Sequence, residues 1–210
     1  GGLEREVLLQ TPPSYEPSQP HPAIVALTYR RRGASEYVER GGIAEGARRA
    51  GYVVVAPEAI DPDFEPTKSP FEALKPTESL APPHVAPWNE PSDMVFVYES
   101  VTRAADETCL DMNRIFAIGH AEGARMLQQM TCESSEFPFA AIVLTGFAAQ
   151  VGKRCRQRHA VPTLRVAGID DTFVPFVGGP GCAGAEFHSS ARTDELWSGS
   201  HGCSNAAAEP

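Results

Sequence analysis

A short stretch in the middle of the chain restricts its possible folds more than any other part of the sequence. The apolar run at residues 115–118 has the length and composition of a buried strand. Beyond Gly123, apolar residues recur at helical spacing and share one side of a helix: Ala124, Leu127 and Met130. Gly119 and Gly123 each lie two residues from Ala121. The pattern predicts a strand, a tight turn with Ala121 at its apex, and then a helix.

A strand, a turn and a helix with a glycine two residues on either side of the apex form the frame of a nucleophile elbow. The frame needs glycines because its strained apex packs close to the neighbouring strand and helix. The apex is normally Ser, or sometimes Cys or Asp, but here it is Ala121, whose methyl group cannot attack an ester. We therefore expect the frame of an ester-cleaving site with its nucleophile position vacant. The alternative is an ordinary turn that carries two glycines.

The other apolar runs alternate with helical segments, which is typical of a mostly parallel sheet in an α/β domain. We expect strands at 4–10, 23–27, 52–56, 139–144 and 163–167, and helices at 34–50, at 91–107 and from 193. Ser92 is the expected cap of the second helix, with Asp93 placed favourably for the helix dipole. The Pro-rich stretch 61–91 has no sustained period and predicts a surface loop near a functional face, with disorder as the alternative. The Gly-rich stretch 178–184 predicts another loop, and residues 1–210 a single domain.

Charge and composition exclude several classes of function. The net charge of −9 lacks the basic surface that nucleic acid requires. Apolar runs stay well short of the ~20 residues of a membrane-spanning helix, so we expect no membrane span. The spacing of the five cysteines matches no zinc motif, and we expect neither a metal nor a cofactor.

The cysteines predict an oxidising, extracellular compartment and at least one disulfide, with scattered free thiols as the alternative. Cys109 and Cys132 bracket the elbow strand and helix, so they could approach each other at the far ends of these elements. Whether Cys155 pairs with Cys182 stays open at this point. Because five is an odd number, one cysteine is expected to find its partner on another chain or segment.

A hydrolase built on an elbow needs an acid and a histidine, in that order along the chain. Asp171 follows the strand predicted at 163–167, and we prefer it to Asp170 because the spacing Gly-x-x-Asp-x-x-Val-Pro is typical of an acid loop. A turn or capping role for Asp171 is the alternative. After Asp171 only His188 and His201 remain, and neither follows a final strand, so each is better explained as a surface histidine. His120 lies beside the apex, but its side chain is expected to point away from where a base must act.

An oxyanion hole needs two backbone N–H groups, one directly after the apex and one after the strand predicted at 23–27. Glu122 supplies the first position and Tyr29 the second. Arginines follow Tyr29 at 30–32, where this kind of site normally has glycines. The arginines form either a solvated face or an anion-binding segment.

On these motifs, which extend over nearly its whole length, the chain resembles the secreted esterases of the polyhydroxybutyrate depolymerase and feruloyl/acetylxylan esterase group. The matching segments are the Pro-Pro-x-Tyr opening at 12–15, the Cys-x-Asp-x-x-Arg approach to the elbow at 109–114, the acid loop at 161–179, and Trp197 with Gly202-Cys203. The resemblance implies an α/β-hydrolase fold with helices on both faces of the sheet. It also implies that Cys132 is the disulfide partner of Cys109.

The chain departs from this family at the positions that carry chemistry. Ala121 stands where the family has its serine, and Thr28-Tyr29-Arg30 where it has His-Gly-Gly. The chain ends at Pro210, before the family's last strand and helix and before the Gly-His that supplies the base. By this resemblance, Cys203 would pair with a cysteine in that segment or on a second chain.

The resemblance and the departures together predict a catalytically inactive relative of these serine carboxyl-esterases, retained for binding or assembly with a protein or glycan partner. The altered segment from Tyr29 to Arg32 favours this interpretation, because a deliberate Ser→Ala change would not also rewrite the oxyanion loop. One alternative is a serine esterase inactivated on purpose at position 121, with its histidine on a second chain. Another is a carbohydrate-binding module that uses the old cleft.

Overall fold

A computed structural model describes most of the chain. The described residues are 5–28, 33–58, 91–133, 139–153, 155, 160–181 and 184–203. The loop predicted at 61–91 lies outside these residues except for Pro91, and so do Tyr29 and the arginines at 30–32. No helix in the described ranges is long and apolar enough to cross a membrane.

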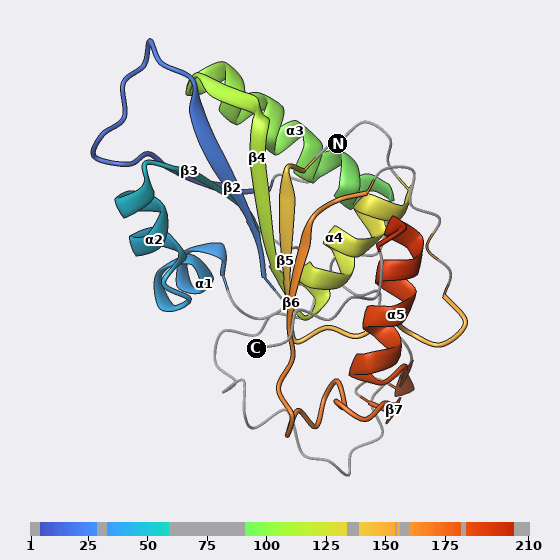
Figure 1. Ribbon diagram of the computed structural model, residues 1–210. Helices are drawn as coiled ribbons and strands as arrows, with labels where there is room; N and C mark the ends of the chain where they lie inside the picture. Colours follow the sequence, from blue (N-terminus) through green and yellow to red (C-terminus); the bar gives the residue numbers. More distant parts are fainter. Residues whose placement is uncertain are drawn as a thin grey trace.

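A six-stranded sheet forms the centre of the molecule (Figure 1). Its strands are β1 (Val7–Gln10), β2 (His21–Leu27), β3 (Val53–Pro57), β4 (Leu110–His120), β5 (Ala141–Thr145) and β6 (Thr163–Val166). They are arranged in the order β1-β3-β2-β4-β5-β6. Only β1 runs antiparallel to its neighbour, and each of the other pairs is parallel. The predicted mostly parallel sheet is therefore confirmed.

Helices cover both faces of the sheet, as Figure 1 shows. On one face lie α3 (Pro91–Glu107), α4 (Glu122–Glu133) and α5 (Ser190–His201), and on the other α1 (Ala34–Arg40) and α2 (Ile43–Ala50). Strand β2 shows why two layers form, because successive side chains of a strand point to opposite faces. Val25 belongs to the apolar cluster under α3 and α4, whereas its neighbour Ala26 belongs to the cluster under α1 and α2.

Two predicted elements differ from the structure. The single helix predicted at 34–50 is divided at Gly41 and Gly42, and Gly42 has φ 70°, a left-handed conformation that interrupts the helix. The predicted loop at 178–184 contains a short strand, β7 (Gly179–Pro180), which pairs with β8 (Glu186–Phe187). The helix predicted at 91–107 has the predicted bounds, but it already begins at Pro91, so Ser92 lies inside its first turn.

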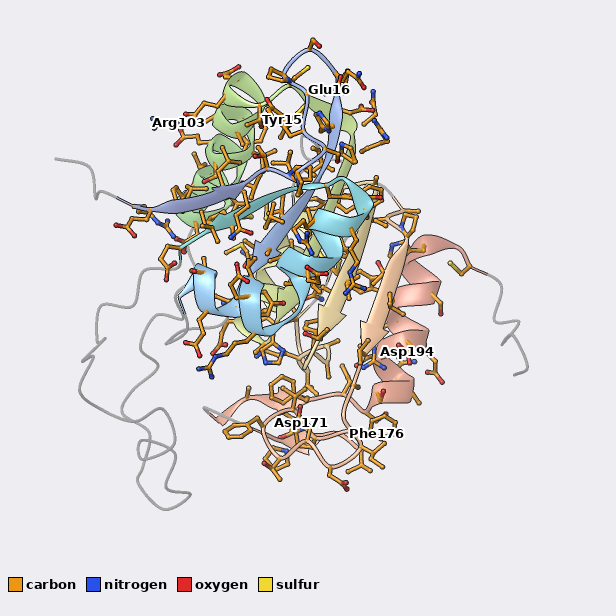
Figure 2. All side chains as sticks on the ribbon, turned by 90° about the vertical axis from the view of Figure 1, so that its left-hand side faces the viewer. Tyr15, Glu16, Arg103, Asp171, Phe176 and Asp194 are labelled. Carbon is orange, nitrogen blue, oxygen red and sulfur yellow. A yellow bond between two sulfur atoms is a disulfide. The ribbon has the colours of Figure 1, made fainter. Side chains whose placement is uncertain are left out.

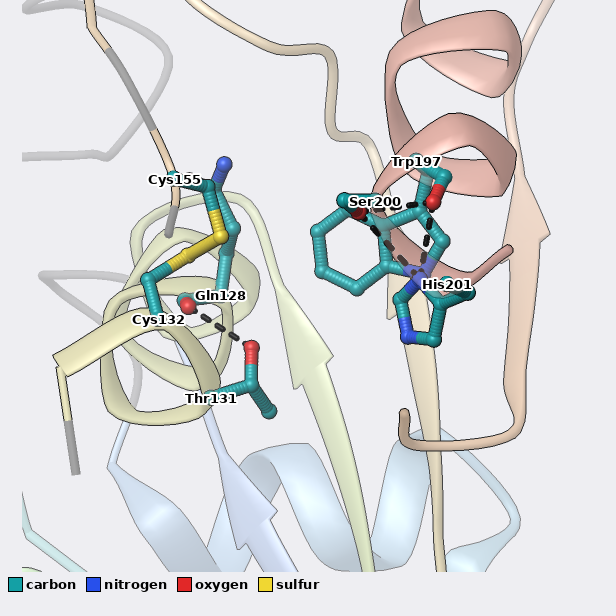
Figure 3. Close-up of a disulfide and its surroundings, with 7 residues drawn as sticks. All are labelled: Gln128, Thr131, Cys132, Cys155, Trp197, Ser200 and His201. Atoms are coloured by element: carbon teal, nitrogen blue, oxygen red, sulfur yellow. Dashed lines mark hydrogen bonds between the residues drawn. A yellow bond between two sulfur atoms is a disulfide. The ribbon is translucent and has the colours of Figure 1, made fainter. Parts of the chain in front are cut away.

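The disulfide joins Cys132 to Cys155, and Cys109 is a free thiol, so the predicted pairing of Cys109 with Cys132 is wrong (Figure 3). The reason is the different rise of the two elements that leave the elbow. The eleven residues of β4 cover about 36 Å at the usual rise of a strand. Glu122 to Cys132 covers only about 16 Å at the usual rise of a helix. Cys109 therefore lies far beyond the end of α4, and its carbonyl accepts a hydrogen bond from His21 N instead.

Candidate functional site

The turn predicted at Ala121 is present and sharp. Ala121 has φ 52°, and no other non-glycine residue in the described ranges has a positive φ. A left-handed conformation costs an L-residue roughly 1–2 kcal/mol, so the surrounding packing must hold this turn in place. The chain reaches the apex from β4 and leaves it directly into α4. This is the backbone geometry of a nucleophile elbow.

The two glycines beside the apex are required by close packing. A Cβ atom at Gly119 would lie 2.6 Å from the backbone nitrogen of Ala124. At Gly123 it would lie 2.1 Å from the carbonyl oxygen of Leu27, the last residue of β2. Any side chain at Gly123 would therefore push α4 away from the sheet. These contacts and the positive φ at Ala121 favour a strained elbow over an ordinary turn that carries two glycines.

Hydrogen bonds to β5 fix the orientation of the elbow. The backbone N–H of Ala121 donates to the carbonyl of Thr145 at 2.9 Å. The Thr145 hydroxyl donates to the carbonyl of Gly119 at 3.1 Å, and it lies 2.9 Å from Nδ1 of His120. Because the single hydroxyl hydrogen is used for Gly119, Nδ1 of His120 must donate to the threonine oxygen. The His120 ring is thus oriented by its neighbours in the sheet.

The opposite side of the His120 ring faces α1. Its ring centroid lies 6.4 Å from that of Tyr37, and the two rings are stacked. Burial raises the pKa of the Tyr37 phenol to about 12, so this group is neutral over the physiological pH range. His120 therefore lies among structural contacts on the α1 side of the sheet.

Asp171 lies in a loop close to the elbow. Its Oδ1 accepts hydrogen bonds from the backbone N–H groups of Phe173 at 2.8 Å and Val174 at 2.9 Å. Asp170, which the spacing made the less suitable acid, is exposed and does not line the neighbouring pocket. The loop around Asp171 and Phe176 lies below the sheet in Figure 2. The two backbone bonds set the direction of the Asp171 carboxylate.

A pocket connects Asp171 with the residues that follow β5. It is lined by Gly146, Phe147, Ala148, Arg165, Ala167, Asp171, Val174, Pro175, Phe176 and Ser190. Gly146 also touches the elbow, since a Cβ atom on it would lie 3.1 Å from Cε1 of His120 and 3.9 Å from the nitrogen of Ala121. The apex and Asp171 thus both lie at the edge of the sheet where the parallel strands β4 and β6 end, and Gly146 touches the elbow and lines the pocket that Asp171 also lines.

One of the two predicted oxyanion donors lies in the described part of the chain. Glu122 is the first residue of α4, so its backbone N–H has no acceptor within the helix, as an oxyanion donor would require. The second predicted donor, Tyr29, lies outside the described residues. Arg125, one turn after the apex, is half-buried; its burial lowers the pKa of its guanidinium, and the charges of Glu122 and Asp93 act in the opposite direction.

The histidines that follow Asp171 do not complete a triad in the described part of the chain. The His201 ring bonds through Nδ1 to the carbonyl of Trp197, and His201 is the last residue of α5, whereas the pocket residue Ser190 is the first residue of that helix. His188 follows β8, and its backbone N–H donates to the carbonyl of Ala149. Among the described residues, the hydrogen bonds of the Asp171 carboxylate come from backbone N–H groups only.

Arg165 is a residue of this site that the sequence alone did not reveal. It lies on β6, lines the pocket, and forms an ion pair with Asp194 of α5, with Nε 2.8 Å from Oδ1. The available signal was an arginine at an alternating position of the apolar stretch 163–167. That signal was weak, because Asp194 lies 29 residues further along the chain.

Several known proteins share sequence or structural similarity with this chain. No protein-family model matches the chain. A probable feruloyl esterase C from Aspergillus flavus is 23% identical over 182 residues, which cover 84% of this chain and 58% of that protein. The solved structure of a thermostable esterase has a TM-score of 0.61 and 21% identity, over 95% of this chain and 48% of that one. The structure of LpqC, a poly(3-hydroxybutyrate) depolymerase from Bordetella parapertussis, has a TM-score of 0.59 and 17% identity. The match covers 92% of this chain and 71% of that one.

The chain has an α/β-hydrolase fold. The similarity to these solved structures, the mostly parallel sheet and the helices on both faces together confirm the fold class predicted from the sequence. The curated relative extends this similarity to an esterase at the level of sequence. The chain spans only 58% of the length of that relative. In this α/β-hydrolase fold, Ala121 occupies the apex of the elbow and Asp171 the loop after β6.

Proposed function

We propose that this α/β-hydrolase domain is a catalytically inactive relative of serine carboxyl-esterases, which binds an ester-containing ligand or a partner without cleaving an ester. The observation that supports the proposal is the alanine at the strained apex, where φ is 52°. A nucleophile at this position must supply an oxygen or sulfur atom, and a methyl group supplies neither. In the serine protease subtilisin, removal of the nucleophilic serine lowers kcat by about a million-fold.

The rest of the frame supports a binding role. The packing that strains the elbow is intact at Gly119 and Gly123, and the Asp171 carboxylate lines a pocket beside it. Glu122 N–H lies at the start of α4, where the helix dipole favours a partially negative oxygen. A ligand carbonyl could therefore be held at the apex even though no acyl transfer follows.

The test compares the natural chain with an Ala121→Ser variant. We expect neither protein to hydrolyse 4-nitrophenyl acetate or methyl ferulate above the buffer rate, because among the described residues no histidine ring is hydrogen-bonded to the Asp171 carboxylate. We also expect isothermal titration calorimetry to detect methyl ferulate binding to both proteins. Robust hydrolysis by the Ala121→Ser variant would contradict the proposal, because it would mean that the remaining machinery is complete.

A second candidate is a serine esterase in which Ala121 replaces an original serine and the histidine comes from another segment or chain. The positive φ at Ala121 favours it, because this strained geometry serves a nucleophile. The Ala121→Ser assay separates the two candidates when it is run on the complete protein together with any further segment or chain that would supply the histidine, because only the second candidate then predicts hydrolysis. No described residue specifically favours the carbohydrate-binding alternative. The Cys132–Cys155 disulfide is compatible with an extracellular or other oxidising compartment, which we propose for the domain.

A further inference from the structure

The Arg165 side chain is largely buried, although the residues on either side of it in β6 are exposed. Its neighbours on β6, Leu164 and Val166, are 60% and 51% exposed, whereas the Arg165 side chain is only 11% exposed. Arginine is rarely buried unless its donors are paired. A largely buried arginine on this strand therefore requires a set of acceptors close to the pocket.

The acceptors of Arg165 come from two different segments. Nε and Nη2 donate to the two carboxylate oxygens of Asp194, each at 2.8 Å, which is a bidentate arrangement. Nη1 donates to the carbonyl of Phe147 at 3.2 Å, and Nη2 to the carbonyl of Ser190 at 3.2 Å and to the Ser190 hydroxyl. One planar group on β6 thus binds the loop after β5 and the first two turns of α5.

The bound segments are also the walls of the Asp171 pocket. Phe147 and Ser190 line that pocket together with Arg165. The backbone N–H of Ser190 donates to the carbonyl of Phe176, which anchors the acid loop to α5 at 2.8 Å. The Thr193 hydroxyl, which is fully buried, accepts a hydrogen bond from Ala149 N at 3.1 Å. The start of α5 is therefore hydrogen-bonded to both walls of the pocket, which are the loop after β5 and the acid loop. Arg165 in turn binds the start of α5.

We propose that Arg165, oriented by Asp194, is a positioning residue that sets the separation between the loop after β5 and the acid loop, and thereby the orientation of the Asp171 carboxylate in the pocket. It acts through the pocket walls, because Nε, Nη1 and Nη2 of Arg165 each donate to an acceptor within the protein. The Asp194 carboxylate is 62% exposed, so water screens the ion pair and its contribution to the stability of the fold is small. The main effect of the ion pair is geometric. The Asp194 carboxylate fixes the plane of the Arg165 guanidinium, which donates to the carbonyls of Phe147 and Ser190.

The matched control lies one residue further along the same helix. Glu195 pairs with Arg192 at 2.9 Å, both side chains are more than half exposed, and neither lines the pocket. Asp194→Asn and Glu195→Gln therefore remove one charge each from neighbouring positions of α5. Arg165→Lys keeps the charge of Arg165 but cannot reproduce the planar fork of donors.

Three measurements on the full chain test the proposal: thermal unfolding, the amide signals of Phe173 and Val174 in a ¹H–¹⁵N spectrum, and the affinity for methyl ferulate. These two amides donate to Asp171, so they report its orientation. We expect Asp194→Asn and Arg165→Lys to shift both signals and to weaken methyl ferulate binding by about tenfold, which is the scale of coupling within one hydrogen-bond network. Glu195→Gln should change neither signal nor affinity.

The proposal is overturned if Asp194→Asn leaves both amide signals in place, whatever happens to the melting temperature, because Arg165 would then have a purely structural role. Should Arg165→Lys fail to fold, Asp194→Asn and its control still decide the question. Only the affinity measurement rests on the proposed function. If the natural chain does not bind methyl ferulate, the proposed ligand is wrong, while the amide signals still test the positioning role of Arg165.

Discussion

The backbone N–H of Ala121 donates to the carbonyl of Thr145 across 2.9 Å, so the apex of the elbow is tied to the end of the neighbouring strand. The next residue, Gly146, lines the pocket that contains Asp171. The end of β5 therefore lies between Ala121 and the pocket that Asp171 lines. The geometry of the elbow can be tested separately from any activity, because its strain and its packing each affect stability in a defined direction.

Ala121→Gly should stabilise the fold. The left-handed conformation at φ 52° costs an alanine roughly 1–2 kcal/mol, which glycine does not incur. Glycine loses more chain entropy on folding, about 0.5–1 kcal/mol, so the net gain is expected to be of the order of 0.5 kcal/mol. Urea unfolding measures this difference. Ala121→Val, which adds a β-branched side chain at the same φ, should destabilise the fold; a stable Val variant would mean that the apex is not strained.

Gly123→Ala should destabilise the domain strongly. The new Cβ would lie 2.1 Å from the carbonyl oxygen of Leu27, which is backbone at the end of the central strand β2 and cannot move aside. We expect a loss of about 3 kcal/mol or more, at the upper end of overpacking effects. Gly46→Ala is the matched control, because no atom lies within 4 Å of its added Cβ on α2. This control should gain about 0.5–1 kcal/mol, and equal losses in both variants would contradict the packing argument.

The features that the sequence predicted well are those encoded by neighbouring residues. Residues 115–130 specify a strand, an apex and a helix within one short stretch, so the bend at Ala121 could be expected from local pattern alone. The position of Asp171 could be expected for a similar reason, because its loop directly follows β6, while its role as the acid stays a prediction. The division of the 34–50 helix was missed, because Gly41 and Gly42 are compatible with both a continuous helix and a break.

The features that the sequence did not predict depend on distances between elements. The pairing of Cys132 with Cys155 instead of Cys109 follows from the different lengths of β4 and α4, which cysteine spacing does not contain. Arg165 pairs with a residue on another element, so only the assembled sheet and helix bring the two together. Local patterns thus predicted the elbow, whereas the walls of the pocket required the three-dimensional arrangement.

Removing the disulfide should destabilise the domain without altering the elbow. Cys132 and Cys155 are separated by 23 residues, and closing a loop of this size stabilises a fold by about 3 kcal/mol in the chain-entropy account. Cys132→Ser should therefore lower the free energy of unfolding by about that amount, as measured in urea. Cys109→Ser is the control, since Cys109 is a free thiol. If Cys109→Ser were the more destabilising of the two, the pairing shown in Figure 3 would be contradicted.

The stability of the fold should fall at high pH because of Tyr37. The pKa of this phenol is raised from 10.0 to about 12 by burial, which penalises the charged phenolate in the folded state. A raised folded-state pKa means that the folded protein holds the proton more tightly than the unfolded chain does. The contribution of Tyr37 is therefore complete below pH 10 and is lost as the pH rises from 10 to about 12.

The measurement is the free energy of unfolding between about pH 9 and pH 12, a range that brackets the ionisation of the Tyr37 phenol in the unfolded and folded states. It is compared between the natural chain and a Tyr37→Phe variant. We expect the natural chain to lose stability more steeply across this range, because the variant has no phenol to ionise beside His120. Tyr98→Phe is the control, since it removes a phenol from a side chain on α3 that is 43% exposed to water. Parallel curves for the natural chain and Tyr37→Phe would show that the Tyr37 phenol ionises as freely in the folded state as in the unfolded chain.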